Sequence, residues 1–345
     1  MKILAQEADQ SRDGNPYIHL LYENLRAVGG RIKPLNRRRL LERQDIVHVH
    51  WPEMLVEWRR GPLFAIADSV KCLIGIAMAR LRGARLAWTG HNLAPHELPH
   101  PRIHAAFSAI FQRMVDLVIT LSPAGGEALQ TRYSVLRRKT LVTIPHGHYR
   151  DAYGAKADRV EARRQLDLPL EGRIFLLLGM IRRYKNVPAL IRAFDDHANG
   201  SHLLIAGKIG SDAALEDEVR QAATRARGVT LHLHHVPAPD VPLYHAAADV
   251  VVLPYTSGTA LNSGAAILAL SFDRPVVVQD SGAMADLQAL VGTQWLARFS
   301  GDASEALAEA ERLAARERPD DLDLSALDWP PIGQATLDAF RSVLR

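Results

Sequence analysis

Residues 174–194 read IFLLLGMIRRYKNVPALIRAF. The first five residues form a continuous apolar run, which is typical of a strand buried on both faces, and Gly179 ends that run. The residues from Val187 to Asp195 then place apolar side chains at helical spacing. A buried strand followed directly by a helix is the repeating unit of a parallel sheet, so this stretch predicts an α/β fold.

The same alternation of strand and helix runs along the rest of the chain. The expected strands are Lys2–Ala5, Ile46–His50, Leu86–Thr89, Leu117–Leu121, Leu141–Ile144, Ile174–Leu178, His202–Ala206, Val229–His232, Val250–Leu253 and Val276–Val278. The expected helices are Tyr17–Val28, Phe64–Leu81, His104–Val115, Val187–Asp195, Ala213–Arg227, Leu243–Ala248, Ala265–Leu270 and Trp329–Leu344. Two such series predict two Rossmann-like doubly wound parallel sheets, with ligands bound beyond the carboxyl ends of the strands, in a central cleft between the domains.

A polar and charged stretch at residues 155–164 separates the two series. A length of 345 residues also fits two domains better than one. We therefore expect one domain at residues 1–155 and a second at residues 156–328. The last helix, within residues 329–345, could cap the second domain or cross back to the first.

Composition narrows the class of protein. With 48% hydrophobic and 23% charged residues, the chain can bury large cores, which excludes general disorder. A single cysteine, Cys72, excludes an intrachain disulfide and a cysteine-based zinc cluster. No apolar run approaches the roughly 18–20 residues of a membrane-spanning helix, so we expect no transmembrane protein, and the start MKILAQEAD is unlike a secretory signal. A cytoplasmic protein is the expectation.

The charge is distributed unevenly. Residues 1–150 contain 22 Lys and Arg against 12 Asp and Glu, whereas residues 151–345 contain 20 against 26. A basic first half indicates an anionic partner, such as nucleic acid, a phospholipid surface or a pyrophosphate-bearing substrate. Ordinary solvated surface charge is the alternative.

In the second half, cations follow the strand at Ile174–Leu178. Arg182, Arg183 and Lys185 stand just before a helix, where the helix dipole favours negative charge, so they indicate a bound anion. A basic loop without a ligand is the alternative. Lys208, in GKIGSD after the next strand, repeats the pattern more weakly.

The loop PYTSGTALNSGAA, at residues 254–266, is rich in neutral hydrogen-bonding groups and glycine. Its candidate ligand-binding residues are Thr256, Ser257, Gly258, Thr259, Asn262, Ser263 and Gly264. Glycines let the backbone approach a ligand, and hydroxyl and amide groups ahead of a helix suit a diphosphate or a sugar. An ordinary helix cap needs only one such side chain.

In the first half, polar side chains follow two strands. His50, Trp51 and Glu53 stand in IVHVHWPE, and His91, Asn92, His96 and Glu97 stand in LAWTGHNLAPHE. A metal site is disfavoured because these segments lack a helical i, i+4 ligand pair, and general-base work fits them better. We expect His48 to be a core residue. His146, near the domain boundary, could reach the cleft.

These residues, in this order, resemble a GT-B glycosyltransferase over essentially the whole chain. The motifs are DIVHVHWPE, TGHN, LVITLSPAGGEAL, TIPHGHY, LLLGMIRRYKNVPALIRAF, LLIAGK and AADVVVLPY. In glycosyltransferase family 4 a G-R-L-x-x-x-K loop grips the donor pyrophosphate. Here the loop is G-M-I-R-R-Y-K, so Lys185 matches the lysine, Met180 replaces the arginine, and Arg182 or Arg183 is its substitute.

Family 4 enzymes also carry two glutamates eight positions apart, and those positions fall here on Ala260 and Leu268. The chain is more similar to bacterial exopolysaccharide transferases of glycosyltransferase family 94, the xanthan-type β-mannosyltransferases. That resemblance implies an inverting transfer from GDP-mannose to a polyprenyl-diphosphate-linked oligosaccharide. It also implies an acceptor-binding first domain, a donor-binding second domain and a last helix that crosses back to the first.

The implied mechanism is a single displacement with neither a metal nor a cofactor besides the nucleotide sugar. Glu53 is the first candidate for the base, and His91 and Glu97 are its rivals. The expected donor-binding residues are Arg182, Arg183, Lys185, Lys208, Ser257, Gly258, Thr259, Asn262, Ser263 and His146.

A lipid-linked acceptor would also account for the basic first half. Arg31, Lys33, Arg37, Arg38, Arg39 and Arg43 fall within thirteen positions, and the helix Phe64–Leu81 is unusually apolar. We expect peripheral contact with anionic lipid at the inner face of the plasma membrane. A core helix packed on the sheet is the alternative for Phe64–Leu81.

Four other functions stay open. A retaining, family-4-like hexosyltransferase would use a UDP- or GDP-sugar. A nucleotide-sugar epimerase would act on donor alone, and a non-catalytic GT-B-like protein would bind donor without turnover. A nucleic-acid binder would explain the basic half, but no known motif for it is apparent, and only Trp51 and Trp58 lie near the basic patch as stacking residues.

Overall fold

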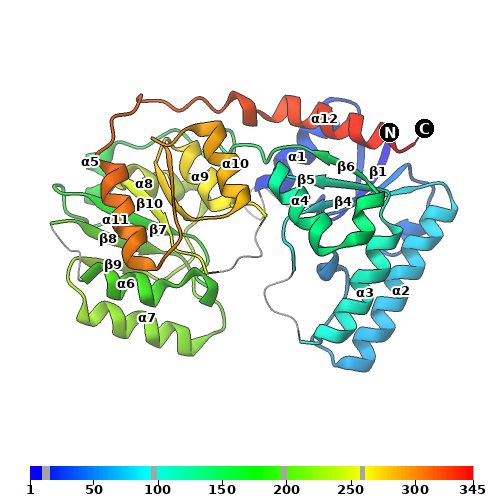
Figure 1. Cartoon of the computed structure of the whole chain (residues 1–345), viewed down its shortest axis with the longest axis horizontal. Coiled ribbons are helices and arrows are strands. Elements are labelled where there is room, and N and C mark those ends of the chain that lie inside the picture. The colour runs from blue at the N-terminus through cyan, green and yellow to red at the C-terminus, as the bar shows by residue number, and fades with distance from the viewer. Residues whose placement is uncertain (10–15, 95–98, 196–199, 257–260, 345) are drawn as a thin grey trace. The chain divides into compact units, whose positions relative to one another are not determined.

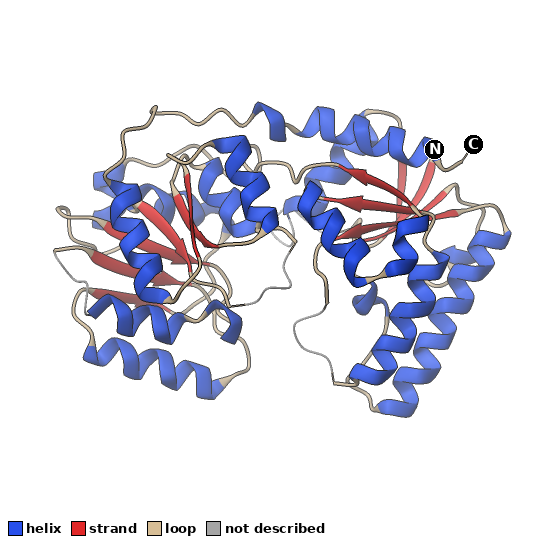
Figure 2. Ribbon diagram, viewed as in Figure 1, coloured by secondary structure: helices blue, strands red, loops and turns tan. Residues whose placement is uncertain are grey.

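The structure is a computed structural model, and it describes residues 1–9, 16–94, 99–195, 200–256 and 261–344. The chain divides into two compact units (Figures 1 and 2). The first unit comprises Met1–Gly147, Thr259–Asn262 and Leu327–Arg345, and the second comprises His148–Gly258 and Ser263–Ala326.

The first unit is built on a parallel six-stranded sheet in the order β2-β1-β3-β4-β5-β6. Its strands are β1 (Lys2–Ala5), β2 (Arg31–Pro34), β3 (Ile46–Val49), β4 (Arg85–Gly90), β5 (Leu117–Thr120) and β6 (Thr140–Thr143). Its α-helices are α1 (Pro16–Ala27), α2 (Pro62–Leu81), α3 (Pro101–Met114), α4 (Pro123–Arg132) and α12 (Trp329–Ser342), with short 3-10 helices η1 (Arg39–Leu41), η2 (Pro52–Leu55) and η3 (Ser134–Arg138). The central strands β3 and β5 are buried along their whole length, as their continuous apolar runs require.

The second unit has its own parallel six-stranded sheet, in the order β12-β11-β10-β7-β8-β9. Its strands are β7 (Ile174–Leu178), β8 (His202–Ala206), β9 (Val229–His232), β10 (Val250–Leu253), β11 (Val276–Gln279) and β12 (Leu296–Phe299). Its α-helices are α5 (Arg159–Gln165), α6 (Val187–Asp195), α7 (Ala213–Arg225), α8 (Val241–Ala247), α9 (Gly264–Ser271), α10 (Gly282–Val291) and α11 (Ala303–Ala314), with 3-10 helices η4 (Arg183–Lys185), η5 (Ala238–Asp240) and η6 (Ser325–Leu327).

The strand orders identify where each sheet binds ligands. In the first unit the chain reverses direction across the sheet between β1 and β3, and in the second it does so between β7 and β10. Ligands of open parallel sheets bind at such switch points, beyond the carboxyl ends of the strands. The segments after β3 and β7, which contain Glu53 and Lys185, therefore start at the expected positions.

The C-terminal helix α12 belongs to the first unit and packs along α1, as Figure 1 shows. Gly333 of α12 lies so close to α1 that an added Cβ would be 2.9 Å from Cβ of Asn24. Trp329, only 2% exposed, packs against Gly147 and Tyr17. The division between the units thus falls after Gly147, and α12 completes the unit that contains α1.

The strands expected at Lys2–Ala5, Ile174–Leu178, His202–Ala206, Val229–His232 and Val250–Leu253 are confirmed to the residue. The helix expected at Val187–Asp195 is also confirmed to the residue, and the other expected strands and helices occur with ends shifted by one to three residues. The sequence did not predict strands β2 and β12 or helices α4, α10 and α11. The edge strand β2, sequence RIKP, alternates exposed and partly exposed residues and so lacks the apolar run used to find strands. Helix α4 contains two glycines and no strong apolar face.

The expectation that no apolar run is long enough to span a membrane was wrong. Helix α2 has 20 residues and a mean hydropathy of 1.6, which is long and apolar enough to cross a membrane by length and composition. Only 33% of that apolar stretch is buried. Both readings of this helix therefore apply in part, because one face packs on the sheet and the other is exposed.

Candidate active site

The carboxyl end of β3 is fixed by Gln6, which follows β1. The side-chain oxygen of Gln6 accepts hydrogen bonds from the backbone N–H groups of His50 and Trp51, at 2.8 and 2.9 Å. Its amide nitrogen donates to the carbonyl of Trp51 at 2.9 Å. One buried side chain at the switch point therefore sets the path of the chain from β3 into the HWPE segment.

A chain of hydrogen bonds connects three histidines beneath this strand end. Nε2 of His91 lies 3.0 Å from Nδ1 of His50, whose Nε2 lies 2.9 Å from the hydroxyl of Tyr22. The same hydroxyl lies 3.0 Å from Nδ1 of His48, and Nε2 of His48 lies 2.9 Å from the hydroxyl of Thr89. His48, expected to be a core residue, is fully buried within this chain.

Burial keeps these imidazoles uncharged. Desolvation lowers the pKa of His48 and of His91 to about 3, and it lowers the pKa of His50 well below its usual value. His146 lies nearby in the same unit, with its ring centroid 4.4 Å from that of Tyr17, and desolvation lowers its pKa to about 4. Neutral rings of this kind donate through one nitrogen and accept through the other.

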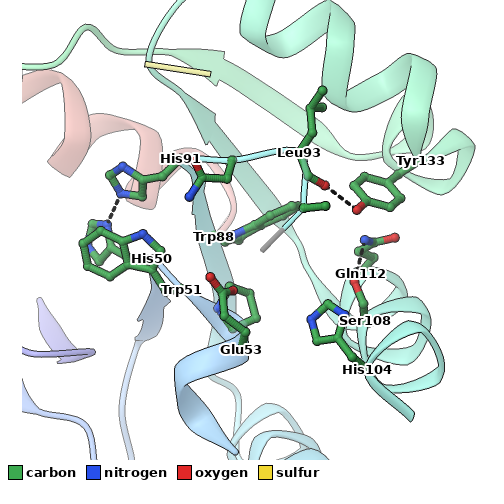
Figure 3. A pocket seen from close by; sticks show the side chains of 13 residues that line it. His50, Trp51, Glu53, Trp88, His91, Leu93, His104, Ser108, Gln112 and Tyr133 are labelled. Atoms are coloured by element: carbon green, nitrogen blue, oxygen red, sulfur yellow. Dashed lines mark hydrogen bonds between the residues drawn. The ribbon is translucent and has the colours of Figure 1, made fainter. Parts of the chain in front are cut away.

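Glu53 lies in a small pocket that opens beside these histidines (Figure 3). The pocket is lined by His50, Trp51, Pro52, Glu53, Trp88, His91, Asn92, Leu93, Ala94, His104, Ser108, Gln112 and Tyr133. The backbone carbonyl of Glu53 accepts a 2.6 Å hydrogen bond from the indole of Trp58, which anchors the short helix η2. Desolvation raises the pKa of the Glu53 carboxyl, because burial disfavours its charged form.

One residue that lines this pocket, Trp88, has a buried polar group without a partner among the described residues. That group is the N–H of its indole ring. The pocket wall also holds Gln112, whose amide donates to the hydroxyl of Ser108 at 2.9 Å. Buried donors that the protein leaves unsatisfied are costly, and a ligand hydroxyl could satisfy the Trp88 indole.

In the second unit, two loops converge at the β7–β10 switch point. The backbone N–H of Thr256, after β10, donates to the carbonyl of Tyr184, after β7, at 2.8 Å. Lys185 is 7% exposed, and its Nζ lies 5.3 Å from the ring centroid of Tyr255. Its pKa is lowered to about 8, first by desolvation and then by the charge of Arg182.

Glycines allow the loops after β7 and β8 to approach each other closely, because a side chain at these positions would clash. Gly179 and Gly207 both have positive φ, and a Cβ on Gly207 would lie 2.2 Å from the carbonyl oxygen of Gly179. A guanidinium nitrogen of Arg182 lies 2.9 Å from where a Cβ of Gly210 would be. Nζ of Lys185 likewise lies 3.2 Å from where a Cβ of Gly179 would be, so Arg182 and Lys185 both lie against glycine positions that follow strands.

The other expected donor-binding residues have different surroundings. Arg183 is exposed and forms ion pairs with two carboxylates, Asp212 at 2.7 Å and Glu218 at 3.1 Å, so its charge is already paired within the protein. Lys208 is exposed. Ser263 caps α9 by accepting from the N–H of Ala266, and Asn262 is grouped with the first unit, as is His146. Ser257, Gly258, Thr259 and Glu97 lie outside the described residues.

The chain is similar in sequence to an enzyme that handles a nucleotide sugar. It is 31% identical over 327 residues to the GDP-mannose:glycolipid 4-beta-D-mannosyltransferase of Xanthomonas campestris pv. campestris, covering 93% of this chain and 86% of that protein. The chain belongs to this family of glycosyltransferases. Residues 172–315 of the glycosyltransferase also match the family model described as "Glycosyl transferases group 1".

Solved structures confirm the GT-B fold of the glycosyltransferase. Anabaena HepE in complex with UDP superposes with a TM-score of 0.65 at 16% identity, covering 99% of both chains. The catalytic domain of starch synthase IV from Arabidopsis thaliana, bound to ADP and acarbose, superposes with a TM-score of 0.60 at 15% identity, covering 95% of this chain and 77% of that one. At these identities the likeness concerns the fold alone.

Sequence reasoning missed several residues of the glycosyltransferase's candidate site. Tyr17, Tyr22 and Gln6 stand on α1 or after β1, and no local motif marks them. Tyr17 contacts the rings of His50, His91, His146 and Trp329, at centroid distances of 5.8, 5.2, 4.4 and 5.7 Å. Their position in the chain could have indicated them, because the end of β1 and helix α1 both border the first switch point.

Proposed function

We propose that the glycosyltransferase moves mannose from GDP-mannose to a hydroxyl of a polyprenyl-diphosphate-linked oligosaccharide in bacterial exopolysaccharide synthesis. The observation that carries this proposal is the 31% identity to a GDP-mannose:glycolipid mannosyltransferase, which extends through both units. The converging loops of the second unit, with Lys185 and Arg182, suit the diphosphate of such a donor.

The proposed reaction is a single displacement without a metal. Glu53 takes the proton of the acceptor hydroxyl, and the oxygen attacks the anomeric carbon as the bond from that carbon to the β-phosphate oxygen breaks. GDP leaves with the electron pair of that bond. Lys185 and Arg182 stabilise the negative charge that grows on the diphosphate, and the product has the opposite anomeric configuration to the donor.

The geometry favours Glu53 over His91 as the base. A pKa of about 3 makes His91 a weak proton acceptor at neutral pH. A second proton on His91 would also leave a positive charge on a buried chain of neutral groups, because that chain ends within the sheet at Thr89. Glu53 needs no such relay, because its own carboxylate gains the proton and loses its charge.

A glycolipid acceptor requires contact with a membrane, and the exposed face of α2 suits that contact. Its exposed apolar residues are Leu63, Ile66, Val70, Ile74 and Leu81, with exposed fractions of 82, 46, 48, 57 and 83%. Helix α3 lies beside α2 and adds Ile110, which is 47% exposed (Figure 1). An apolar strip of this length is rare on the surface of a monomeric protein.

The charges near this strip are complementary to anionic lipid. The one carboxylate within α2 and α3, Asp68, is buried and paired with Arg37 at 2.6 Å. The exposed charged residues of the two helices and their ends are the cations Lys71, Arg82, Arg102 and Arg113. Each cation near an anionic surface contributes about 1 kcal/mol. We therefore propose that the enzyme acts at the inner face of the plasma membrane, with α2 against the headgroups.

Incubation with GDP-mannose and a bacterial glycolipid extract tests the proposed activity. We expect a mannosylated glycolipid and free GDP, with a β linkage if the donor is the α anomer. Thermal shift with GDP, UDP and ADP identifies the nucleobase of the donor, since a ligand at 100 times its Kd stabilises by about 2.7 kcal/mol. Donor binding without turnover would contradict the enzymatic proposal, and a retained anomeric configuration would indicate the family-4-like alternative.

A further inference from the structure

The hydrogen-bonded chain Thr89–His48–Tyr22–His50–His91 has a property that none of its members has alone. Every link is a single contact of 2.9 or 3.0 Å between two atoms, and the residues come from β4, β3, α1, the end of β3 and the end of β4. His48, Tyr22, His50 and Thr89 are all at most 1% exposed, so water does not reach their links freely.

We infer that Tyr22 is a positioning residue that forces His48, His50 and His91 to share one tautomer. A neutral imidazole has one donor and one acceptor nitrogen, and the Tyr22 hydroxyl has one proton. If His91 donates from Nε2 to Nδ1 of His50, then His50 donates from Nε2 to Tyr22. Tyr22 then donates to Nδ1 of His48, which donates from Nε2 to Thr89.

In that arrangement all three histidines carry the proton on Nε2. Reversing every bond starts from the hydroxyl of Thr89 and puts the proton on Nδ1 of all three. An arrangement in which Tyr22 accepts from both neighbours would leave its own buried hydroxyl proton without a partner, at a cost of about 1–3 kcal/mol. The three rings therefore change tautomer together or not at all.

The consequence concerns the nitrogen that His91 offers to a ligand. Nε2 of His91 is occupied by His50, and His91 lines the pocket that also holds Glu53. Tyr22, which is absent from the residues lining that pocket, thus sets whether Nδ1 of His91 is a hydrogen-bond acceptor or donor. The relevance of this role to a sugar hydroxyl rests on the proposed function. The tautomers themselves can be measured without turnover.

Tyr22→Phe gives the same expected end state from either starting arrangement. Without the hydroxyl, a proton on Nε2 of His50 or on Nδ1 of His48 would be a buried donor with no acceptor. His48 is then expected to carry its proton on Nε2 and donate to Thr89. His50 and His91 are both expected to carry theirs on Nδ1. In the variant the tautomer of His48 should therefore differ from that of His50 and His91, whereas all three share one tautomer in the wild type.

Nitrogen-15 NMR of histidine-labelled protein reads each tautomer, with assignments from single histidine variants. We expect the three rings to agree in the wild type and His48 to differ from the other two in Tyr22→Phe. Thr89→Val should instead fix all three protons on Nδ1, and this variant keeps the test available if Tyr22→Phe does not fold. Mixed tautomers in the wild type, or agreement in Tyr22→Phe, would overturn the inference.

Tyr244→Phe is the matched control. Tyr244 is also buried, and its hydroxyl lies 3.0 Å from Nδ1 of His232 in the second unit. The substitution removes one tyrosine–histidine hydrogen bond of the same kind, so it should leave the tautomers of His48, His50 and His91 unchanged. A change of their tautomers in this control would show that the NMR readout follows general loosening of the fold, and it would also overturn the inference. A failed transfer assay with agreeing tautomers would contradict the proposed function alone.

Discussion

The ammonium group of Lys185 faces the ring of Tyr255, with Nζ 5.3 Å from the ring centroid. A buried lysine is usually paired with a carboxylate, but the described residues provide no ion pair for Lys185. Desolvation, with a smaller contribution from Arg182, lowers its pKa to about 8. A desolvated cation at a strand end, held against an aromatic face, is a strong site for an incoming diphosphate.

Lys185→Ala and Arg182→Ala should each weaken binding of the nucleoside diphosphate by roughly 1.5–3 kcal/mol, the range for hydrogen bonds to charged groups. Arg183→Ala is the control, because Arg183 already binds Asp212 and Glu218 and should contribute little to the ligand. Calorimetry with GDP and with guanosine separates the phosphate contribution. Equal losses for both ligands would mean that these cations only support the fold.

The pKa of Lys185 also predicts a pH dependence for donor binding. Below about 8 the ammonium is charged and attracts the diphosphate, so affinity should fall as the pH rises through 8 and above. A bound diphosphate would move this transition to higher pH by favouring the charged form. Lys185→Arg stays protonated over the same range and should show no such decline. An identical decline in both proteins would assign the effect to another group.

Much of the fold could be predicted from the sequence, because strands buried on both faces leave continuous apolar runs. Ile174–Leu178 and Val250–Leu253 are such runs, and both were predicted to the residue. Edge strand β2 was missed because RIKP has charged residues facing solvent. The exposure of the apolar helix α2 depends on what packs against it, so its sequence alone left a core helix and a surface helix both possible.

The candidate site was predictable where residues follow a strand in sequence, as Glu53 and Lys185 do. It was not predictable where the fold joins distant segments. Tyr22 lies 26 residues before His48, and Gln6 lies 44 residues before His50, so no local pattern connects them. The ion pairs of Arg183 could not be predicted for the same reason, since its partners lie 29 and 35 residues further along the chain.

Ile66→Glu with Val70→Glu should reduce binding to anionic vesicles, because both side chains are exposed on the apolar face of α2. Flotation with phosphatidylglycerol vesicles measures this, and added salt should weaken the wild-type interaction. Leu290→Glu is the matched control, since Leu290 is 53% exposed on α10 of the second unit. Wild-type protein that fails to float with these vesicles at low salt would contradict the membrane contact.

Gly147→Ala should destabilise the first unit by about 1–3 kcal/mol, the usual cost of overpacking. An added Cβ would lie 2.3 Å from Cε2 of Trp329, whose indole is almost fully buried at the start of α12. Gly154→Ala is the control, because nothing lies within 4 Å of its Cβ position. Chemical denaturation of both variants compares the two costs, and equal stability would show that Trp329 can move aside freely.

Glu53→Gln tests the proposed base, because it keeps the shape of the side chain and removes its basicity. We expect kcat to fall by roughly 10²–10⁴, the usual contribution of general-base catalysis, with donor affinity nearly unchanged. In the wild type, activity should rise with pH as the carboxyl ionises, at a pKa raised above 4.5 by desolvation. If the variant keeps more than a tenth of the wild-type kcat, Glu53 is not the general base.

The same variant should also be the more stable protein at neutral pH. A carboxyl whose pKa is raised on folding holds its proton more tightly in the native state than in the unfolded chain. Its contribution to stability is therefore fully present below the ordinary pKa of 4.5 and is lost as the pH rises through the raised value. Glu53→Gln cannot ionise and avoids that loss, so the difference in Tm should grow in its favour from acidic to neutral pH. A variant that loses both activity and stability at neutral pH would indicate that Glu53 supports the fold of the pocket, whereas lost activity with gained stability is the result expected of a desolvated catalytic carboxylate.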